Sequence, residues 1–280
     1  MKLMHRAKPR KTTKQCTIPV AGLSIFDLVH LGIFDDGVMA EIELIYRNIL
    51  LAGEPGAGKS VGLINIVAHG ALSPDCSLWL FDGKQVELGP WKEIADVFVG
   101  PDIDAGLQAL RALQSEMDRR YVELGRVKRR KITRDDPVDV IMLVIDELAL
   151  YTSTYGTKEQ QDEFIRLVRD LVARGRAAGI IVVAATQRPS ADIIPTSLRD
   201  LFGYRLAFRC TTDSSSDIIL GRGWAARGYD ASRIRPEERG VALLLAEGGK
   251  PRRMKTAYLT DAHVYGLIDY ARQLRSGKAA

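Results

Sequence analysis

The chain has 280 residues, of which 46% are hydrophobic and 27% charged, enough apolar material for one large α/β domain or two small ones. Its longest apolar runs, such as Val140–Ile145, fall far short of the roughly 18 residues that a membrane-spanning helix needs. Cys16, Cys76 and Cys210 are far apart and, like the four histidines, lack metal-ligand spacing, so we expect neither disulfides nor a zinc site.

The net charge of +5 is concentrated at the N-terminus. Residues 1–14 carry six basic side chains and no acid, and we expect residues 1–17 to form a disordered basic arm. This arm would either hold DNA phosphates or anionic lipid, or only aid solubility. No apolar signal stretch follows it, so the expected location is the cytoplasm. Eight Lys and Arg side chains between residues 119 and 134 face one acid, Glu123. They indicate either nucleic-acid contact or a solvated face.

From residue 38 onward, strand patterns alternate with helix patterns, which predicts an α/β domain with a mainly parallel central sheet flanked by helices. Strands are expected at residues 38–45, 49–51, 78–81, 140–145, 180–184, 204–208 and 241–245. Apolar residues at three- and four-residue spacing predict helices over 103–124 and 164–172, the second ending near Gly175. No long linker interrupts residues 40–260, so we expect one domain over 18–260, followed by a C-terminal helix and tail at 261–280.

The strongest chemical signal lies between the strand at 49–51 and a helical stretch. It is a complete G-x-x-x-x-G-K-[ST] phosphate-binding loop, whose predicted ATP-binding residues are Gly53, Glu54, Pro55, Gly56, Ala57, Gly58, Lys59, Ser60 and Val61. Such a loop wraps phosphates with backbone N–H groups at a helix N-terminus. Lys59 is expected to reach the β and γ phosphates, and Ser60 to bind Mg²⁺. Pro55 lacks an N–H, so the donors must come from Gly56 onward.

Two adjacent carboxylates end the apolar run at 140–145. Asp146 is predicted to hold Mg²⁺ through its water shell, and Glu147 to accept a hydrogen bond from the attacking water. The alternative is that these acids only cap the helix that follows.

A polar residue also follows the strand at 180–184. Gln187 lies at the carboxyl edge of the sheet, where open α/β sheets bind ligands, and could sense the γ-phosphate. The alternative is an ordinary turn started by Pro189.

Several further motifs, in the same order along the chain, resemble the FtsK/SpoIIIE family of DNA translocases. The likeness covers roughly residues 18–260 and is carried by the segments 81–88 (FDGKQVEL), 116–121 (EMDRRY), 144–149 (VIDELA), 174–180 (RGRAAGI), 184–190 (AATQRPS), 205–209 (RLAFR), 213–216 and 221–223. The block from Arg174 to Ser190 is the most specific part of it.

The resemblance implies a RecA-like P-loop NTPase fold, ATP hydrolysis and assembly into a hexameric ring around double-stranded DNA. In such a ring, an arginine from one subunit can neutralise charge on the phosphoryl group held by its neighbour. Arg174 and Arg176 are the candidates. The alternative for both is surface pairing or contact with DNA phosphates.

The sequence departs from the family pattern at Glu54-Pro55 and at the basic stretch 128–134. We also expect it to lack the membrane anchor and the C-terminal winged-helix DNA reader of full-length division translocases. With a short architecture and the segment 237–241 (EERGV), it looks more like the transfer proteins of actinobacterial conjugative plasmids and integrative elements. We therefore expect a DNA translocase that acts in conjugal transfer and is recruited to the membrane by a partner protein. The alternatives are a chromosome-segregation pump, a secretion-type ATPase acting on proteins, and a non-hydrolysing ATP-binding scaffold, against which Glu147 argues.

Overall fold

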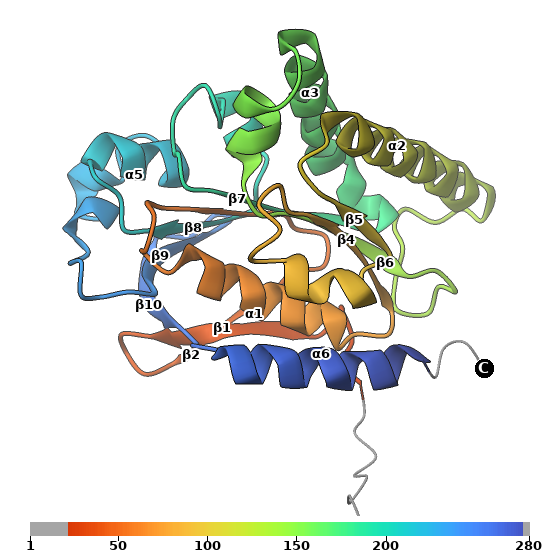
Figure 1. Cartoon of the computed structure of the whole chain (residues 1–280), viewed down its shortest axis with the longest axis horizontal. Coiled ribbons are helices and arrows are strands. Elements are labelled where there is room, and N and C mark those ends of the chain that lie inside the picture. Colours follow the sequence, from red (N-terminus) through yellow and green to blue (C-terminus); the bar gives the residue numbers. More distant parts are fainter. Residues whose placement is uncertain (1–21, 277–280) are drawn as a thin grey trace, which may run out of the picture.

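The computed structural model describes residues 22–276, so the basic arm at 1–17 and Cys16 lie outside the described part. Within it, ten strands form one sheet with helices on both faces (Figure 1). The strands are β1 (Leu28–Phe34), β2 (Met39–Glu43), β3 (Ile49–Ala52), β4 (Cys76–Phe81), β5 (Val97–Val99), β6 (Val140–Ile145), β7 (Ile180–Thr186), β8 (Tyr204–Phe208), β9 (Val241–Ala246) and β10 (Arg252–Thr256). The α-helices are α1 (Lys59–Ala71), α2 (Ile103–Arg126), α3 (Lys158–Arg174), α4 (Thr196–Arg199), α5 (Asp213–Leu220) and α6 (Asp261–Ser276).

The strand order is β2-β1-β10-β9-β8-β3-β7-β6-β4-β5. The strands from β8 to β5 in this order pair in parallel, whereas β9, β10, β1 and β2 extend the sheet with antiparallel pairing. The predicted fold class, an α/β domain with a mainly parallel central sheet, is confirmed. All parallel strands end at the same edge, which is called the carboxyl edge below.

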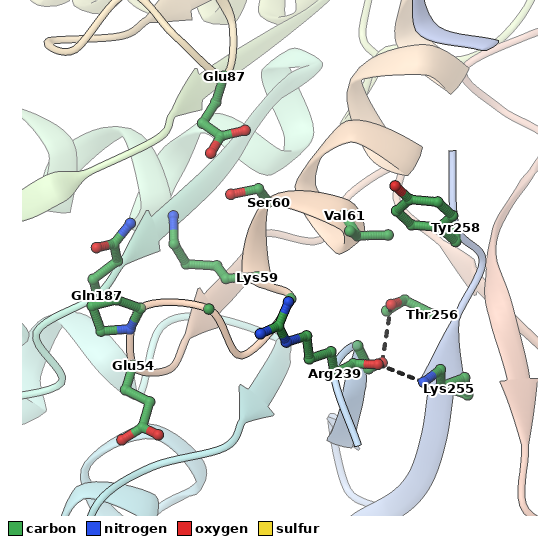
Figure 2. Close-up of a pocket in the computed structure, with 14 residues that line it drawn as sticks. Glu54, Lys59, Ser60, Val61, Glu87, Gln187, Arg239, Lys255, Thr256 and Tyr258 are labelled. Atoms are coloured by element: carbon green, nitrogen blue, oxygen red, sulfur yellow. Dashed lines mark hydrogen bonds between the residues drawn. The ribbon is translucent and has the colours of Figure 1, made fainter. Parts of the chain in front are cut away.

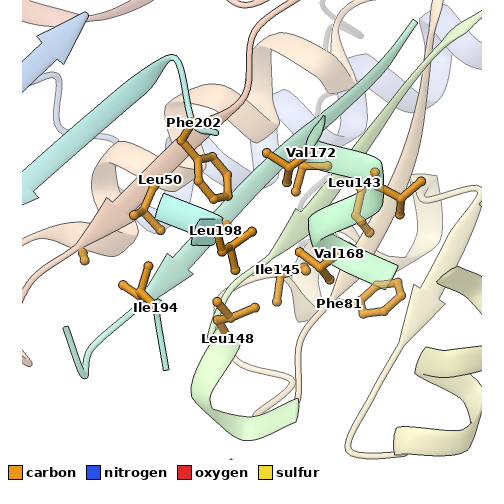
Figure 3. Close-up of a cluster of buried hydrophobic side chains, with 14 of the residues drawn as sticks. Leu50, Phe81, Leu143, Ile145, Leu148, Val168, Val172, Ile194, Leu198 and Phe202 are labelled. Carbon is orange, nitrogen blue, oxygen red and sulfur yellow. The ribbon is translucent and has the colours of Figure 1, made fainter. Parts of the chain in front are cut away.

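Buried apolar residues alternate between the two faces of the central strands. One face of the sheet packs against α2 and α3 through residues such as Phe81, Leu143 and Val168 (Figure 3), and the other packs against α1 and α6. Because β3, β6 and β7 are covered on both faces, every residue in them is buried. The two hydrophobic cores, one on each face of the sheet, therefore fix the strands whose carboxyl ends carry the polar residues of the site.

A buried side-chain amide links the start of β3 to α3 and β7 at the opposite edge of the sheet. Asn48, only 1% exposed, donates from Nδ2 to the carbonyl of Val172 at 2.8 Å and accepts at Oδ1 from the amide of Val182 at 2.7 Å. This side chain satisfies the end of α3 and the interior of β7 together, so it fixes β3 against both elements.

Arginine 120, part of the 116–121 motif, has a structural role. It is buried, pairs with Glu116 at 2.7 Å, and donates to the carbonyls of Ala178 at 2.9 Å and Asp139 at 3.0 Å. It therefore ties α2 to the turn that precedes β7. Helix α3 ends at Arg174 and is capped by Gly175, as the apolar spacing predicted.

Candidate active site

The phosphate-binding loop leaves β3 at the carboxyl edge and enters α1. Gly58 has φ +101°, and a Cβ there would lie 2.4 Å from the amide nitrogen of Gly240, so only glycine fits. The Gly240 amide donates to the carbonyl of Ala57 at 2.8 Å, which anchors the loop to the start of β9. Within the described residues, the amides of Gly56, Gly58, Lys59 and Ser60 donate to no protein acceptor. These four donors, at a helix N-terminus, can receive phosphate oxygens.

The unusual Glu54 has partners that explain its presence in the loop. Its carboxylate forms an ion pair with Arg209, accepts a hydrogen bond from Thr211 Oγ1 at 2.9 Å, and its amide donates to the carbonyl of Arg209 at 2.9 Å. Arg209 and Thr211 lie between β8 and α5. The outer edge of the phosphate loop is therefore fastened to the segment that leads into α5.

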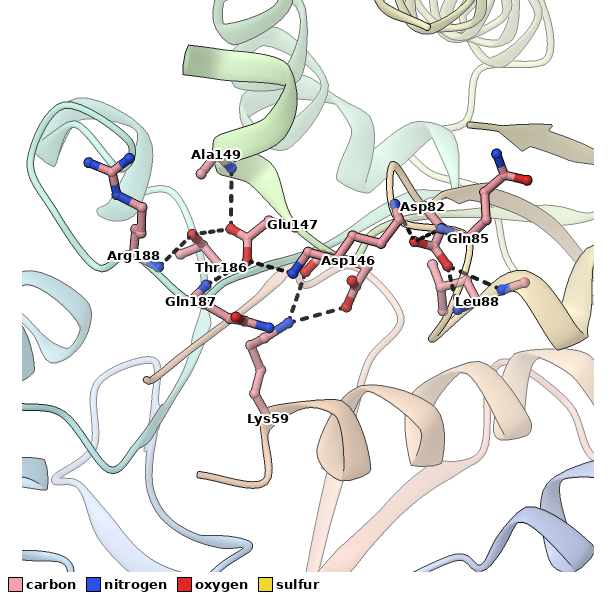
Figure 4. A network of polar contacts seen from close by, with 12 residues as sticks. Lys59, Asp82, Gln85, Leu88, Asp146, Glu147, Ala149, Thr186, Gln187 and Arg188 are labelled. Carbon is pink, nitrogen blue, oxygen red and sulfur yellow. Dashed lines mark hydrogen bonds and ion pairs between the residues drawn. The ribbon is translucent and has the colours of Figure 1, made fainter. Parts of the chain in front are cut away.

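Lys59 and Asp146 meet in the interior at the centre of the site (Figure 4). Lys59 Nζ lies 3.2 Å from Asp146 Oδ1 and donates to the Asp146 carbonyl at 2.9 Å, and both side chains are buried. Burial raises the pKa of Asp146, and the nearby Lys59 ammonium opposes that rise. The predicted lysine and aspartate are therefore brought together, with the lysine held at the carboxyl edge.

The second oxygen of Asp146 is available to a metal. Asp146 Oδ2 is buried and has no hydrogen-bond partner, which is unfavourable unless a ligand completes it. Ser60 follows Lys59, the partner of Asp146, and both Ser60 and Lys59 line a cavity beside the phosphate loop. Within residues 22–276 no group of three or more His, Cys, Asp or Glu residues could hold a metal. One carboxylate and one hydroxyl therefore suit Mg²⁺, which keeps water and phosphate oxygens as its other ligands.

The end of β7 orients Glu147 through hydrogen bonds. Its Oε1 accepts from Thr186 Oγ1 at 2.6 Å, and its Oε2 accepts from the backbone amide of Gln187 at 2.9 Å (Figure 4). Thr186 Oγ1 also accepts from the amide of Arg188 at 3.1 Å. The carboxylate of one strand end is thus oriented by the next strand. The sequence did not indicate Thr186, although it directly precedes the predicted Gln187.

The segment after β4 forms a tight loop around a buried acid. Both oxygens of Asp82 accept hydrogen bonds, at 2.8 to 3.1 Å, from the backbone amides of Lys84, Gln85, Leu88 and Gly89. This loop places Lys84 Nζ 4.0 Å from Glu147 Oε2. It also directs Glu87 into the cavity that contains Ser60. The 81–88 motif therefore contributes two charged side chains to the site, which its residue pattern alone did not predict.

A cavity of about 440 Å³ runs along the phosphate loop (Figure 2). Lys59 and Gln187 lie at one end, and Val61 and Tyr258 lie at the other. The remaining wall comes from the β9 and β10 region, with Arg239, Gly240, Lys255 and Thr256. Sequence reasoning gave none of these residues a role in the site: Arg239 and Gly240 lie in a segment that only indicated a family likeness, and Lys255 and Thr256 belong to no local motif.

Arg174 and Arg176 lie at the edge of the sheet opposite to the phosphate loop, before β7 begins. Arg174 contacts two carboxylates, with hydrogen bonds to Asp170 at 2.6 and 2.7 Å and to Asp118 at 3.0 Å. These partners raise the pKa of Arg174 further. Arg176 donates to the carbonyl of Tyr46 and has only one longer acidic contact, with Glu247 at 3.5 Å. Arg174 is therefore held more firmly by carboxylates than Arg176.

The basic cluster at 119–134 is largely neutralised. Five of its eight cationic side chains form ion pairs: Arg119 and Arg120 with Glu116, Arg126 with Glu123, Arg129 with Asp136, and Arg134 with Asp27. Lys131 lies over the ring of Tyr46, 4.1 Å from its centroid. In the described part of the chain, Lys128 and Arg130 form no ion pair. Most of these positive charges are therefore paired with acidic side chains of the same chain.

The fold and the site define a P-loop ATPase: a phosphate loop, its lysine and two carboxylates meet at the carboxyl edge of a mainly parallel sheet. Residues 6–153 match the FtsK/SpoIIIE family model, and the chain belongs to the FtsK/SpoIIIE family.

Individual relatives agree with this assignment. DNA translocase FtsK of Corynebacterium glutamicum is 30% identical over 254 residues, which are 81% of this chain and 26% of that protein. DNA translocase SpoIIIE of Bacillus subtilis is 29% identical over 266 residues, 87% of this chain and 32% of that protein. The chain thus spans about a quarter to a third of the length of these curated relatives.

Solved structures share the fold. The pCW3 conjugation coupling protein TcpA, determined with ATPγS, has a TM-score of 0.74 at 24% identity and covers 89% of this chain and 70% of its own. The cytoplasmic domain of the Thermomonospora curvata type VII secretion ATPase EccC has a TM-score of 0.70 at 20% identity, and the match covers 91% of this chain and 32% of that one. In the described residues, no helix has the length and apolar character to cross a bilayer.

Proposed function

We propose that this chain is the motor of an ATP-driven double-stranded DNA translocase. The observation that carries the proposal is the buried Lys59–Asp146 pair beside Glu147, whose carboxylate is hydrogen-bonded to Thr186, in a chain of the FtsK/SpoIIIE family. Relatives named DNA translocases support DNA as the substrate.

The residues of the site divide the work of hydrolysis. Lys59 and the free loop amides bind the β and γ phosphates, and Ser60 and Asp146 hold Mg²⁺, which supplies charge neutralisation on the phosphates when bound. Glu147 orients the attacking water, and Gln187 contacts the γ-phosphate and reports its loss. Thr186 keeps the Glu147 carboxylate in one orientation.

We also propose that the motor works as a hexameric ring, with hydrolysis at the junctions between subunits. The phosphate loop and the two candidate arginines lie at opposite edges of the sheet, which suits a head-to-tail ring. Arg176 is the better finger, because releasing Arg174 breaks three hydrogen bonds to carboxylates. Replacing Arg176 with Ala should lower turnover strongly without weakening nucleotide binding, whereas Arg174→Ala should affect stability more than turnover.

The proposed setting is conjugal transfer of plasmid or integrative-element DNA. It is supported by the resemblance to short actinobacterial transfer proteins and by the fold shared with the conjugation coupling protein TcpA. The motor would act in the cytoplasm and be recruited to the membrane by a partner protein. Loss of DNA transfer, with normal chromosome partition, in donor cells that carry Lys59→Ala would support this setting over chromosome segregation.

The test of the motor itself is steady-state ATP hydrolysis with and without long double-stranded DNA, across a salt series and beside Lys59→Ala. Strong stimulation that fades as salt rises is expected, because a translocase grips phosphates. Turnover that needs Lys59 but ignores DNA would reject the proposal in favour of a secretion-type ATPase.

A further inference from the structure

The nucleotide cavity has two chemically different ends. One end is polar and reactive: Lys59 and Gln187 lie there (Figure 2), and Lys59 Nζ lies 3.2 Å from Asp146 Oδ1 (Figure 4). The other end lies beyond Ser60, where Val61 and Tyr258 line the cavity (Figure 2). The two ends therefore suit different parts of one ligand.

The reactive end fixes the direction in which a nucleoside triphosphate must lie. The γ-phosphate has to reach Lys59, the Mg²⁺ ligands and the water oriented by Glu147. The free amides of Gly58, Lys59 and Ser60 then hold the rest of the phosphate chain along the first turn of α1. The nucleoside is consequently placed past Ser60, at the end formed by Val61 and Tyr258.

Tyr258 is an unusual residue to find at this end. It follows β10, it is 72% exposed, and it is among the most exposed large apolar side chains in the described part of the chain. Since an aromatic side chain gains from burial, so much exposure beside a cavity suits a ring that a ligand covers.

The polar side chains near Tyr258 are already engaged. Thr256 Oγ1 donates to the carbonyl of Gly240 at 2.9 Å, and Lys255 Nζ donates to the carbonyl of Arg239. Beside these two engaged side chains, this end of the cavity presents the aromatic ring of Tyr258 and the methyl groups of Val61.

We propose that Tyr258 and Val61 form the nucleobase subsite, in which the Tyr258 ring stacks on the base and Val61 packs beside it. This inference rests on the proposed function of the cavity as an ATP site, and it adds the way in which the base is recognised. Stacking tolerates any purine, because every base has a π face. The site therefore accepts GTP nearly as well as ATP.

The test is titration calorimetry with Mg·ATPγS, Mg·GTPγS and, as a base-free probe, Mg·tripolyphosphate. Replacing Tyr258 with Ala should weaken ATPγS and GTPγS binding about tenfold each, as expected for loss of one stacking contact. Tyr258→Phe should stay within about twofold of the wild type, because it keeps the ring. All forms should bind tripolyphosphate equally. Tyr265→Ala, which removes another exposed tyrosine, from α6 (58% exposed), is the matched control and should change nothing.

Several outcomes overturn the subsite. ATPγS affinity that survives Tyr258→Ala would mean that the base does not stack there. An equal loss for tripolyphosphate would mean that the substitution distorts the phosphate loop. A preference for ATPγS over GTPγS of more than about tenfold would require a base-reading group elsewhere. If the wild type and Lys59→Ala bind ATPγS equally poorly, the ATP site itself is wrong, which separates failure of the proposed function from failure of the subsite.

Discussion

Replacing Glu147 with Gln separates catalysis from folding and binding. Glutamine has the same shape, so its oxygen can still accept from the Gln187 amide, now 2.9 Å from Oε2. Its NH₂ group can donate to Thr186 Oγ1, which lies 2.6 Å from Oε1. A hydroxyl oxygen has two acceptor sites, so Thr186 can also keep the bond from the Arg188 amide. The Ala149 amide, which donates to Oε1 at 3.4 Å, would then face the NH₂ group, and the Thr186 hydroxyl hydrogen would lose its acceptor. The free energy of unfolding should therefore fall by about 1 to 2 kcal/mol.

The effect on turnover should be far larger. Removing a positioned base costs roughly 10² to 10⁴ in rate, so kcat should fall at least about 100-fold, equivalent to about 3 kcal/mol in the barrier. Affinity for Mg·ATPγS should stay within about threefold, because Lys59 and the loop amides hold the phosphates, whereas Glu147 acts on the attacking water.

The assay combines DNA-stimulated ATP hydrolysis, calorimetric binding of Mg·ATPγS and urea unfolding of the same preparations. Lys59→Ala serves as the contrasting variant, since it should lose binding as well as turnover. Turnover of Glu147→Gln within fivefold of the wild type would refute the role of this carboxylate. A loss of several kcal/mol in unfolding free energy would refute the reasoning about its hydrogen bonds.

Three further predictions concern stability, the phosphate loop and pH. Asn48→Ala should lower the unfolding free energy by about 2 to 4 kcal/mol in urea titrations, because two buried backbone groups lose their hydrogen-bond partner. Asn65→Ala removes one side-chain hydrogen bond and should lower it by about 1 kcal/mol. Gly58→Ala should abolish ATPγS binding in calorimetry, since its Cβ would collide with backbone. Burial raises the pKa of Asp146, so protons should compete with Mg²⁺ at unusually high pH; Mg·ATPγS affinity should fall as pH is lowered, and Asp146→Asn should remove that dependence.

The central part of the fold and site could be predicted because its signals are local. Glycine spacing marks the phosphate loop, and an apolar run that ends in two acids marks the end of β6. Parallel pairing brings such strand ends to one edge without further information. The extended apolar runs of β3, β6, β7, β8 and β9 were likewise visible, because strands covered on both faces contain few polar residues.

The remaining features depend on contacts between distant residues. Strand β10 was missed because its sequence, RRMKT, exposes one face and contains no apolar run. The charge of the basic cluster was overestimated, since Arg134 finds its partner in Asp27, 107 positions away. Glu54 departs from the family pattern in the sequence, and its ion pair with Arg209 gives it a structural role. Only the folded chain shows these pairings.

Gly240 joins the phosphate loop to the antiparallel half of the sheet. Its amide donates to Ala57, and its carbonyl accepts from the amide of Thr256 at 2.8 Å. A pull on the β9–β10 hairpin is therefore transmitted to the loop that holds the phosphates. A displacement of β9 and β10 relative to α1 would therefore change the geometry of the phosphate loop as well.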